Sequence, residues 1–160
     1  MSDLTVREAQ PTDSATIADI WLSGWRDGHL GNVPDELLRA RTPESFTERA
    51  SERVHFTRVA VVNGHVVGFV TVVADEVEQV YVAEAARGAG VANILIADAE
   101  RRIADAGYES AWLAVVSGNV RARRFYERNG WVDSGSFDYE AKDGARVIPV
   151  PCERYVKALV

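Results

Sequence analysis

The stretch from Val77 to Glu100, VEQVYVAEAARGAGVANILIADAE, decides the fold of this chain. It begins as an alternating strand, turns through Arg87–Ala92, and continues as an amphipathic helix. A helix that follows a strand and a glycine-rich turn directs several backbone N–H groups, and the positive end of its dipole, toward one anion. Gly88 and Gly90 let the backbone approach a phosphate with no Cβ in the way. The segment therefore predicts a phosphate-binding turn, and the question is which molecule carries the phosphate.

Two common phosphate-binding turns do not fit this segment. A P-loop, G-x-x-x-x-G-K-[ST], needs a lysine and a hydroxyl directly after its last glycine, whereas Val91 and Ala92 follow Gly90. The dinucleotide fingerprint G-x-G-x-x-G needs a third glycine where Asn93 stands, and it belongs near the first strand of a βαβ unit. The sequence therefore excludes a P-loop and disfavours a dinucleotide.

The rest of the chain predicts a meander of strands followed by alternating strands and helices. Asn63-Gly64, between two β-rich runs, is a strong hairpin signal. The helix after the glycine turn is expected over 90–106, and the apolar run Ala111–Val116 predicts a buried strand. This order of elements indicates an α/β fold with a mixed sheet. We further expect strands at Leu4–Glu8, Thr57–Val62, His65–Ala74, Val77–Val82, Trp131–Tyr139 and Val147–Val156, helices beginning near Thr12, Asp35, Pro43 and Asn119, and a loop at Gly28–Pro34.

Length and composition indicate an ordinary globular chain. At 160 residues it is most simply one domain with a single well-buried core. Its apolar share of 47% and charged share of 26% are typical of such domains. No apolar run reaches the about 18 residues of a membrane span, and the N-terminus carries no secretory signal. We therefore expect a cytoplasmic location and no membrane partner.

Charge and metal-ligating residues exclude further classes of partner. The net charge of −6 comes without a basic stripe, which argues against nucleic acid and slightly favours cationic partners such as amines. The single cysteine, Cys152, has no partner for an internal disulfide, and the three histidines have no ligand spacing. We therefore expect no metal site.

Four motifs, in order over residues 59–132, indicate which molecule carries the phosphate. Val67–Phe69 reads V-G-F, Glu76–Val82 is similar to E-[LI]-x-x-[LI]-Y-V, and Arg87–Ala92 fits [QR]-x-x-G-x-[GA]. Gly118–Trp131 fits G-N-x-x-A-x-x-F-Y-E-x-x-G-[FW]. With these motifs the chain resembles the GNAT superfamily of coenzyme A-dependent N-acyltransferases, although the first 55 residues carry only its looser W…W…L pattern. The resemblance implies one GNAT domain over residues 1–160, with a mixed, mostly antiparallel central sheet flanked by helices.

The same resemblance implies the reaction. It is N-acetyl transfer from acetyl-CoA to a primary amine by direct attack, in a ternary complex and without a metal. The acceptor is expected to be a small-molecule or peptide amine, and a homodimer through the late strands is expected from the same family. Cys152 lies on a late strand without a matched His or Asp, which argues against a covalent enzyme intermediate. The alternative is a non-catalytic acyl-CoA-binding or regulatory module that keeps the fold.

The resemblance also assigns coenzyme contacts. In the family the pyrophosphate lies on the backbone N–H groups of the turn, and the pantetheine arm pairs with the preceding strand. Here this implies main-chain contacts from Val80 and Val82, and a β-bulge that frees the N–H near Val80 to polarise the acetyl carbonyl. Asn119 is implied as a pantetheine contact, and it is also a satisfactory helix N-cap. Arg124 is a candidate for the 3′-phosphate, or else lies on a solvated helix face. The implied coenzyme-binding set is Val80, Tyr81, Val82, Arg87, Gly88, Ala89, Gly90, Val91, Ala92, Asn119 and Arg124.

Three residues are candidates for proton transfer. Tyr126 matches the family tyrosine that reaches the coenzyme sulfur, and a phenol with a reference pKa near ~10 suits a departing thiolate. Glu76 and Glu78 are two residues apart and so point to one face of a strand. Glu76 matches the family glutamate that deprotonates the amine through water, and Glu78 is the second candidate. The structural alternatives are core packing for the tyrosine and a solvated strand face for the glutamates.

Acceptor binding is expected from the N-terminal helices, where the superfamily places its substrate-facing wall. Trp25, Asp27 and His29 are the candidate substrate-binding residues. Asp27 together with Glu78 would present negative charge to a protonated amine. Trp21 is four residues from Trp25, a spacing that also fits a helical stripe packed in the core.

Overall fold

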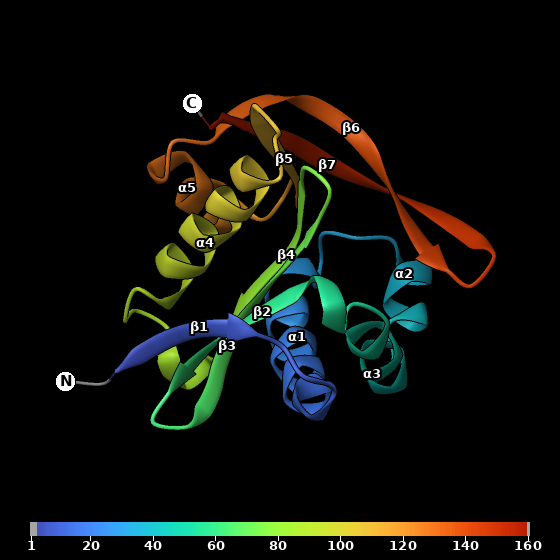
Figure 1. Ribbon diagram of the computed structural model, residues 1–160. Coiled ribbons are helices and arrows are strands. Elements are labelled where there is room, and N and C mark those ends of the chain that lie inside the picture. Colours follow the sequence, from blue (N-terminus) through green and yellow to red (C-terminus); the bar gives the residue numbers. More distant parts are fainter. Residues whose placement is uncertain (1–2, 160) are drawn as a thin grey trace.

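The computed structural model describes residues 3–159, which form one seven-stranded mixed sheet with helices on both faces (Figure 1). The strand order is β1-β2-β3-β4-β5-β7-β6, and neighbouring strands are antiparallel except for β4 and β5. The predicted α/β fold with a mostly antiparallel sheet is thereby confirmed. The strands are β1 (Leu4–Glu8), β2 (Thr57–Val62), β3 (His65–Val73), β4 (Glu76–Val82), β5 (Ser110–Val116), β6 (Val132–Asp143) and β7 (Arg146–Ala158). The helices are α1 (Ser14–His29), α2 (Asp35–Ala40), α3 (Pro43–Glu52), α4 (Val91–Asp105) and α5 (Val120–Arg128), with 3₁₀ turns η1 (Pro11–Asp13), η2 (Val54–Phe56) and η3 (Glu84–Ala86).

Two apolar cores lie on opposite faces of the sheet. One packs α1 and α3 against it, with Trp21, Phe46 and Phe69 fully buried at the contact. The other packs α4 against it, with Leu95 and Val70 fully buried. Because both faces of the central strands are covered, access to the middle of the sheet is left to the place where two strands separate.

That place lies between β4 and β5. The two parallel strands are in register only at Glu76 and Trp112, and beyond this point they diverge. The ladder between β3 and β4 shifts at the same level: Val77 pairs with Val72 and Gln79 pairs with Thr71, so that β4 carries one extra residue there. Such a bulge bends a strand and increases its local twist. The bulge and the separation expected in this strand are both present.

Most element boundaries agree with the sequence, but the loop predicted at Gly28–Pro34 was wrong at its start. α1 continues through Gly28 to His29. A Cβ at Gly28 would lie 2.7 Å from Nδ2 of Asn119. The glycine therefore permits a close approach between α1 and the start of α5, and it does not end the helix.

The β6–β7 hairpin is longer than predicted, because the ladder continues to a tight turn at Gly144-Ala145. Figure 1 shows this hairpin extending past the rest of the sheet toward α2. Ala141 and Ile148 on it are buried in the core formed with α1 and α3. At its tip, Arg146 forms an ion pair with Glu36 of α2. The hairpin therefore serves as a wall that faces the N-terminal helices.

Candidate active site

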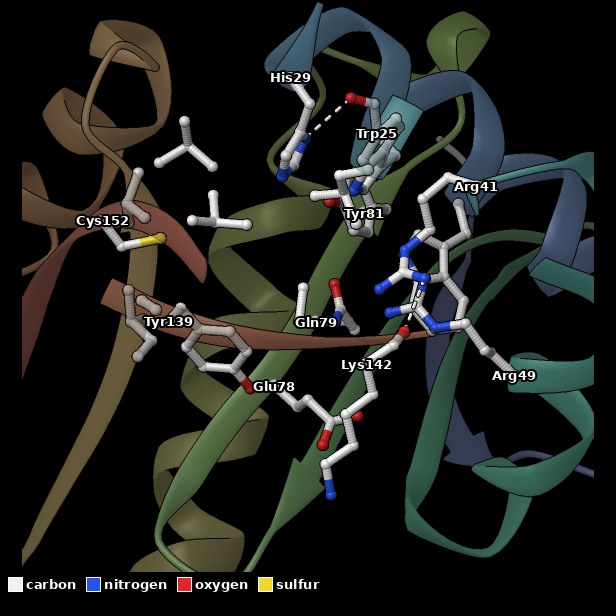
Figure 2. Close-up of a pocket in the computed structure, with 18 of the residues that line it drawn as sticks. Trp25, His29, Arg41, Arg49, Glu78, Gln79, Tyr81, Tyr139, Lys142 and Cys152 are labelled. Carbon is white, nitrogen blue, oxygen red and sulfur yellow. Dashed lines mark hydrogen bonds between the residues drawn. The ribbon is translucent and has the colours of Figure 1, made fainter. Parts of the chain in front are cut away.

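A cavity of about 700 Å³ lies where β4 and β5 diverge. It is bounded by α1 and α3, by the β6–β7 hairpin and by the start of α5, and Figure 2 shows part of its lining. Distant parts of the sequence thus meet around one space. Of the sequence-predicted residues, the lining includes Trp25, His29, Glu76, Glu78, Val80, Tyr81, Asn119 and Tyr126.

The edge of β4 that faces the cavity has unpaired backbone groups. Ala83 N donates to Val67 O at 2.8 Å, immediately beyond the pair formed by Val82 and Gly68. Bonded and non-bonded pairs alternate along an antiparallel ladder, so the N–H groups of Val82 and Val80 point away from β3, toward the space where β5 has diverged. An extended ligand can pair with this edge as a strand would.

The backbone N–H and C=O groups of Tyr81 point toward β3, whereas those of Val80 and Val82 point away from it. Its side chain points to the α1 face of the sheet, with ring centroids 5.9 Å from Phe69. A Cβ at Gly24 of α1 would lie 2.4 Å from Cδ1 of Tyr81, so the helix approaches the ring closely at this glycine. Tyr81 therefore lines the α1 side of the cavity with its ring.

The glycine turn has the predicted conformation. Gly88 and Gly90 have φ values of 85° and 81°, in the left-handed region, and Gly90 is the N-cap of α4. A Cβ at either glycine would meet no atom within 4 Å, so the backbone angle, and not space, requires glycine here. The turn and the N-terminus of a 15-residue helix suit a pyrophosphate.

The side chain of Arg87 leaves this turn and forms an ion pair with Asp27 of α1 at 3.0 Å. The structure therefore does not bring Asp27 into the cavity, and it does not place it beside Glu78 as a source of negative charge for the acceptor. Glu78 has its own partner, since its Oε1 accepts a hydrogen bond from Nε of Arg53 at 2.9 Å. The ion pair of Arg87 instead joins α1 to the phosphate turn.

Residues at the start of α5 reach the cavity from the opposite side. Asn119 caps this helix, its Oδ1 accepting from Ala122 N at 3.2 Å. Tyr126 lies about two turns further along and packs edge-on against Phe125 and Trp131. Burial raises the pKa of the Tyr126 hydroxyl, so it stays protonated and available as a donor. Arg124 is exposed on the outer face of the same helix.

Glu76, at the start of β4, lines the cavity beside Tyr139. Its Oε2 accepts a hydrogen bond from the Tyr139 hydroxyl at 2.8 Å. Burial raises the pKa of Glu76 above its usual range, the bond from Tyr139 partly offsets this, and the nearby charge of Glu78 adds to the rise. A raised pKa makes a carboxylate a stronger proton acceptor.

His29 and Trp25 form the α1 wall of the cavity. Their rings are stacked with centroids 4.5 Å apart, and His29 Nδ1 is 2.8 Å from the Trp25 carbonyl oxygen (Figure 2). Burial lowers the pKa of His29 to about 4, and the positive charges of Arg49 and Arg41 act in the same direction. The imidazole is therefore neutral near pH 7, with Nδ1–H donating to the carbonyl.

The comparison with protein families finds one that accounts for this geometry. The model of the acetyltransferase (GNAT) family matches residues 16–131. The chain belongs to this family. A search of curated proteins found no match.

Solved GNAT structures share the whole fold. A GCN5-related N-acetyltransferase from Rhodopseudomonas palustris superposes with a TM-score of 0.77 at 21% identity, covering 99% of this chain and 97% of that one. The PaiA N-acetyltransferase from Thermoplasma acidophilum, in complex with coenzyme A, gives 0.75 at 17% identity, covering 98% and 99%. YncA, a putative acetyltransferase from Salmonella typhimurium with acetyl-CoA, gives 0.71 at 19% identity, covering 99% and 95%. At these identities the likeness shows the fold.

Several cavity residues of this GNAT chain were missed by the sequence reading. Arg41, Arg49 and Tyr139 come from three separate segments and belong to none of the motifs. Cys152 also reaches the cavity, and burial raises the pKa of its thiol to about 11, so it is almost entirely protonated near pH 7. Only the tertiary fold brings these side chains together, and no spacing in the sequence signals them.

The structure also bears on a metal site and on a membrane span. Over residues 3–159, no cluster of three or more His, Cys, Asp and Glu side chains is arranged to hold a metal ion. In the same part of the chain, every helix is too short or too polar to span a bilayer. The cytoplasmic location stays a prediction.

Proposed function

We propose that the protein transfers acetyl from acetyl-CoA to a primary amine by direct attack in a ternary complex. The observation that carries the proposal is the unpaired edge of β4, which opens into the same cavity as Glu76 and Tyr126. Support comes also from GNAT structures of the same fold that hold coenzyme A or acetyl-CoA.

The residues proposed to hold the donor come from three elements. The N–H groups of the turn from Arg87 to Ala92 would bind the pyrophosphate, and the edge of β4 at Val80 and Val82 would pair with the pantetheine arm. Asn119 would contact the same arm. The N–H of Val80, left free by the separation of the strands, would donate to the acetyl oxygen as negative charge develops there.

Proton transfer is proposed to involve Glu76 and Tyr126. Glu76 would accept the proton of the ammonium group through water, with Tyr139 holding its carboxylate in place. Glu78 is the second candidate, but its carboxylate is already held in an ion pair with Arg53. Tyr126 would donate its hydroxyl proton to the thiolate that leaves. The protonated thiol of Cys152 is a poor nucleophile, which favours direct attack.

The test is release of free thiol from acetyl-CoA by the purified chain in the presence of a broad panel of amines. The proposal predicts that Tyr126→Phe lowers kcat by about 100-fold or more, the usual contribution of a general acid, while the Kd for coenzyme A changes little. Tyr108→Phe is the matched control, because Tyr108 is 41% exposed and does not line the cavity. Binding of acetyl-CoA without acetylation of any amine would instead support a non-catalytic acyl-CoA-binding module.

Homodimerisation is proposed to occur through β6, the edge strand next to β7. An edge strand has unpaired backbone groups, and Val132 on β6 is 62% exposed. Light scattering on the eluted protein would measure the mass. A monomer at all concentrations would reject this part of the proposal.

A further inference from the structure

Two arginine side chains in the cavity lack an anionic partner. Arg41, just after α2, is 8% exposed, and Arg49 of α3 has its Nη1 fully buried without a hydrogen-bond acceptor. Neither guanidinium forms an ion pair with any carboxylate among residues 3–159. Within residues 3–159 the Arg41 guanidinium has one acceptor, the carbonyl oxygen of Lys142 at 2.9 Å. Figure 2 shows both guanidinium groups pointing into the cavity.

The two carboxylates whose charges act on this pair already have partners. Glu78 accepts from Arg53 at 2.9 Å, and Asp143 lies 3.7 Å from Arg146. Arg49 rests on an aromatic surface, its guanidinium carbon 4.3 Å from the centre of the Trp21 ring, which holds it in place without neutralising it. Within residues 3–159, the buried Arg41 and the half-buried Arg49 therefore form no direct ion pair, and only the more distant charges of Asp143 and Glu78 act on them.

In the absence of a ligand, this arrangement of charges destabilises the folded protein. Burial and, to a smaller extent, the nearby charge of Arg41 lower the pKa of Arg49 to about 10, while the charge of Glu78 acts in the opposite direction. Buried charges are normally paired, so an unpaired set that opens on a cavity is suited to an anion from outside. A guanidinium matches a carboxylate with two parallel hydrogen bonds.

We propose that Arg41 and Arg49 bind a carboxylate carried by the acceptor, so that the substrate is an amino acid and not a simple amine or a polyamine. The inference rests on the proposed N-acetyltransfer. Glu76 and Tyr139 line the same cavity beside the open edge of β4, where the amino group must attack. The acceptor therefore has its amino group at β4 and its carboxylate at the arginine pair.

The test uses L-amino acids, each assayed beside its own carboxamide and its decarboxylated amine. The three compounds share a side chain and differ in the anionic group. Wild-type protein should acetylate the amino acid with a kcat/KM about 10- to 100-fold above that of its carboxamide, as expected for hydrogen bonds to a charged group. Matched 1-aminoalkylphosphonates, which carry a phosphonate in place of the α-carboxylate, distinguish a carboxylate site from a general anion site, and preference for the phosphonates would overturn the proposed class.

Variants connect this preference to the two arginines. Arg49→Gln and Arg41→Gln should each raise KM for the amino acid by about tenfold or more, reduce the preference over the carboxamide toward one, and leave the Kd for coenzyme A unchanged. Arg39→Gln is the matched control, since it removes the same charge from an exposed position on α2. Unchanged coenzyme affinity shows that each variant is folded. Calorimetric titration of the amino acid into the complex with coenzyme A should show the same loss of affinity without turnover.

The outcomes separate the two proposals. Acetylation of amines with no preference for the carboxylate, or equal losses for amino acid and carboxamide in Arg49→Gln, overturns the anion site and leaves N-acetyltransfer standing. Acetylation of none of the compounds, together with tight binding of acetyl-CoA, overturns the proposed function and this inference with it.

Discussion

A methyl group added to α1 at Gly28 should weaken coenzyme binding without touching the coenzyme. The Cβ of Gly28→Ala would lie 2.7 Å from Nδ2 of Asn119 and 3.6 Å from its Cγ. The first distance is too short for a non-bonded contact, so the amide must move. Movement of the amide costs two interactions: the cap that Oδ1 forms with Ala122 N at 3.2 Å, and the proposed contact with the pantetheine arm.

The expected sizes follow from these contacts. Replacing a helical glycine by alanine stabilises by about 0.5 kcal/mol, and losing an N-cap costs about 1 kcal/mol, so the free energy of unfolding should fall by about 0.5 kcal/mol. Losing one neutral hydrogen bond to the coenzyme should raise the Kd for coenzyme A by roughly two- to tenfold. Binding should thus change measurably while the fold stays almost equally stable.

A double-mutant cycle with Asn119→Ala provides the assay. In that background no amide faces Gly28, so Gly28→Ala should stabilise by about 0.5 kcal/mol and leave the Kd for coenzyme A unchanged. Urea unfolding and calorimetry measure the two quantities. Equal effects of Gly28→Ala on coenzyme affinity in both backgrounds would show that Asn119 does not transmit the change, and the reasoning would be refuted.

Three further outcomes are expected. Because burial raises the pKa of Glu76, its ionisation opposes folding, and its contribution to stability is present below the unfolded pKa and lost as pH rises through the folded one. Glu76→Gln should therefore lower kcat yet raise the free energy of unfolding at pH 7.5, with the gain disappearing in acid unfolding curves. Tyr139→Phe removes the bond that lowers the pKa of Glu76, so the acid limb of the kcat/KM profile should move to higher pH; an unmoved limb would assign the base elsewhere. Gly24→Ala should cost about 1–3 kcal/mol in urea unfolding, because its Cβ would lie 2.4 Å from the buried Tyr81 ring, and a neutral result would mean that the ring moves freely.

The sequence predicted the parts of the site that depend on local backbone. The turn at Gly88 and Gly90 and the cap at Asn119 are short-range features, and the observed angles and bonds agree with them. The roles assigned to the residues of the turn, to Tyr126 and to Glu76 stay predictions.

The arginine pair that is proposed to bind the acceptor, Arg41 and Arg49, was not predictable in the same way. Arg41 and Arg49 look like ordinary surface arginines in the sequence. In the structure Arg41 donates to Lys142 of the β6–β7 hairpin, and Arg49 packs on the ring of Trp21. The hairpin itself was predicted too short, since the charged residues near its tip resemble a loop. Gly28 resembles a helix terminator in the sequence, because the residue that explains it, Asn119, is 91 positions away and meets it only through tertiary packing.

The single point of register between β4 and β5 has a mechanical consequence. β1–β4 and β5–β7 are two half-sheets joined at one seam, and within residues 3–159 backbone bonding across that seam is confined to the end at Asp75, Glu76 and Trp112. A pantetheine arm paired with the edge of β4 would fill the seam as a removable strand, so that the sheet is complete only in the complex. Amide exchange at Val80 and Val82 should then slow when coenzyme A binds. The bound coenzyme would then bridge the two half-sheets. The sheet would be more rigid in the complex that reacts than in the free protein.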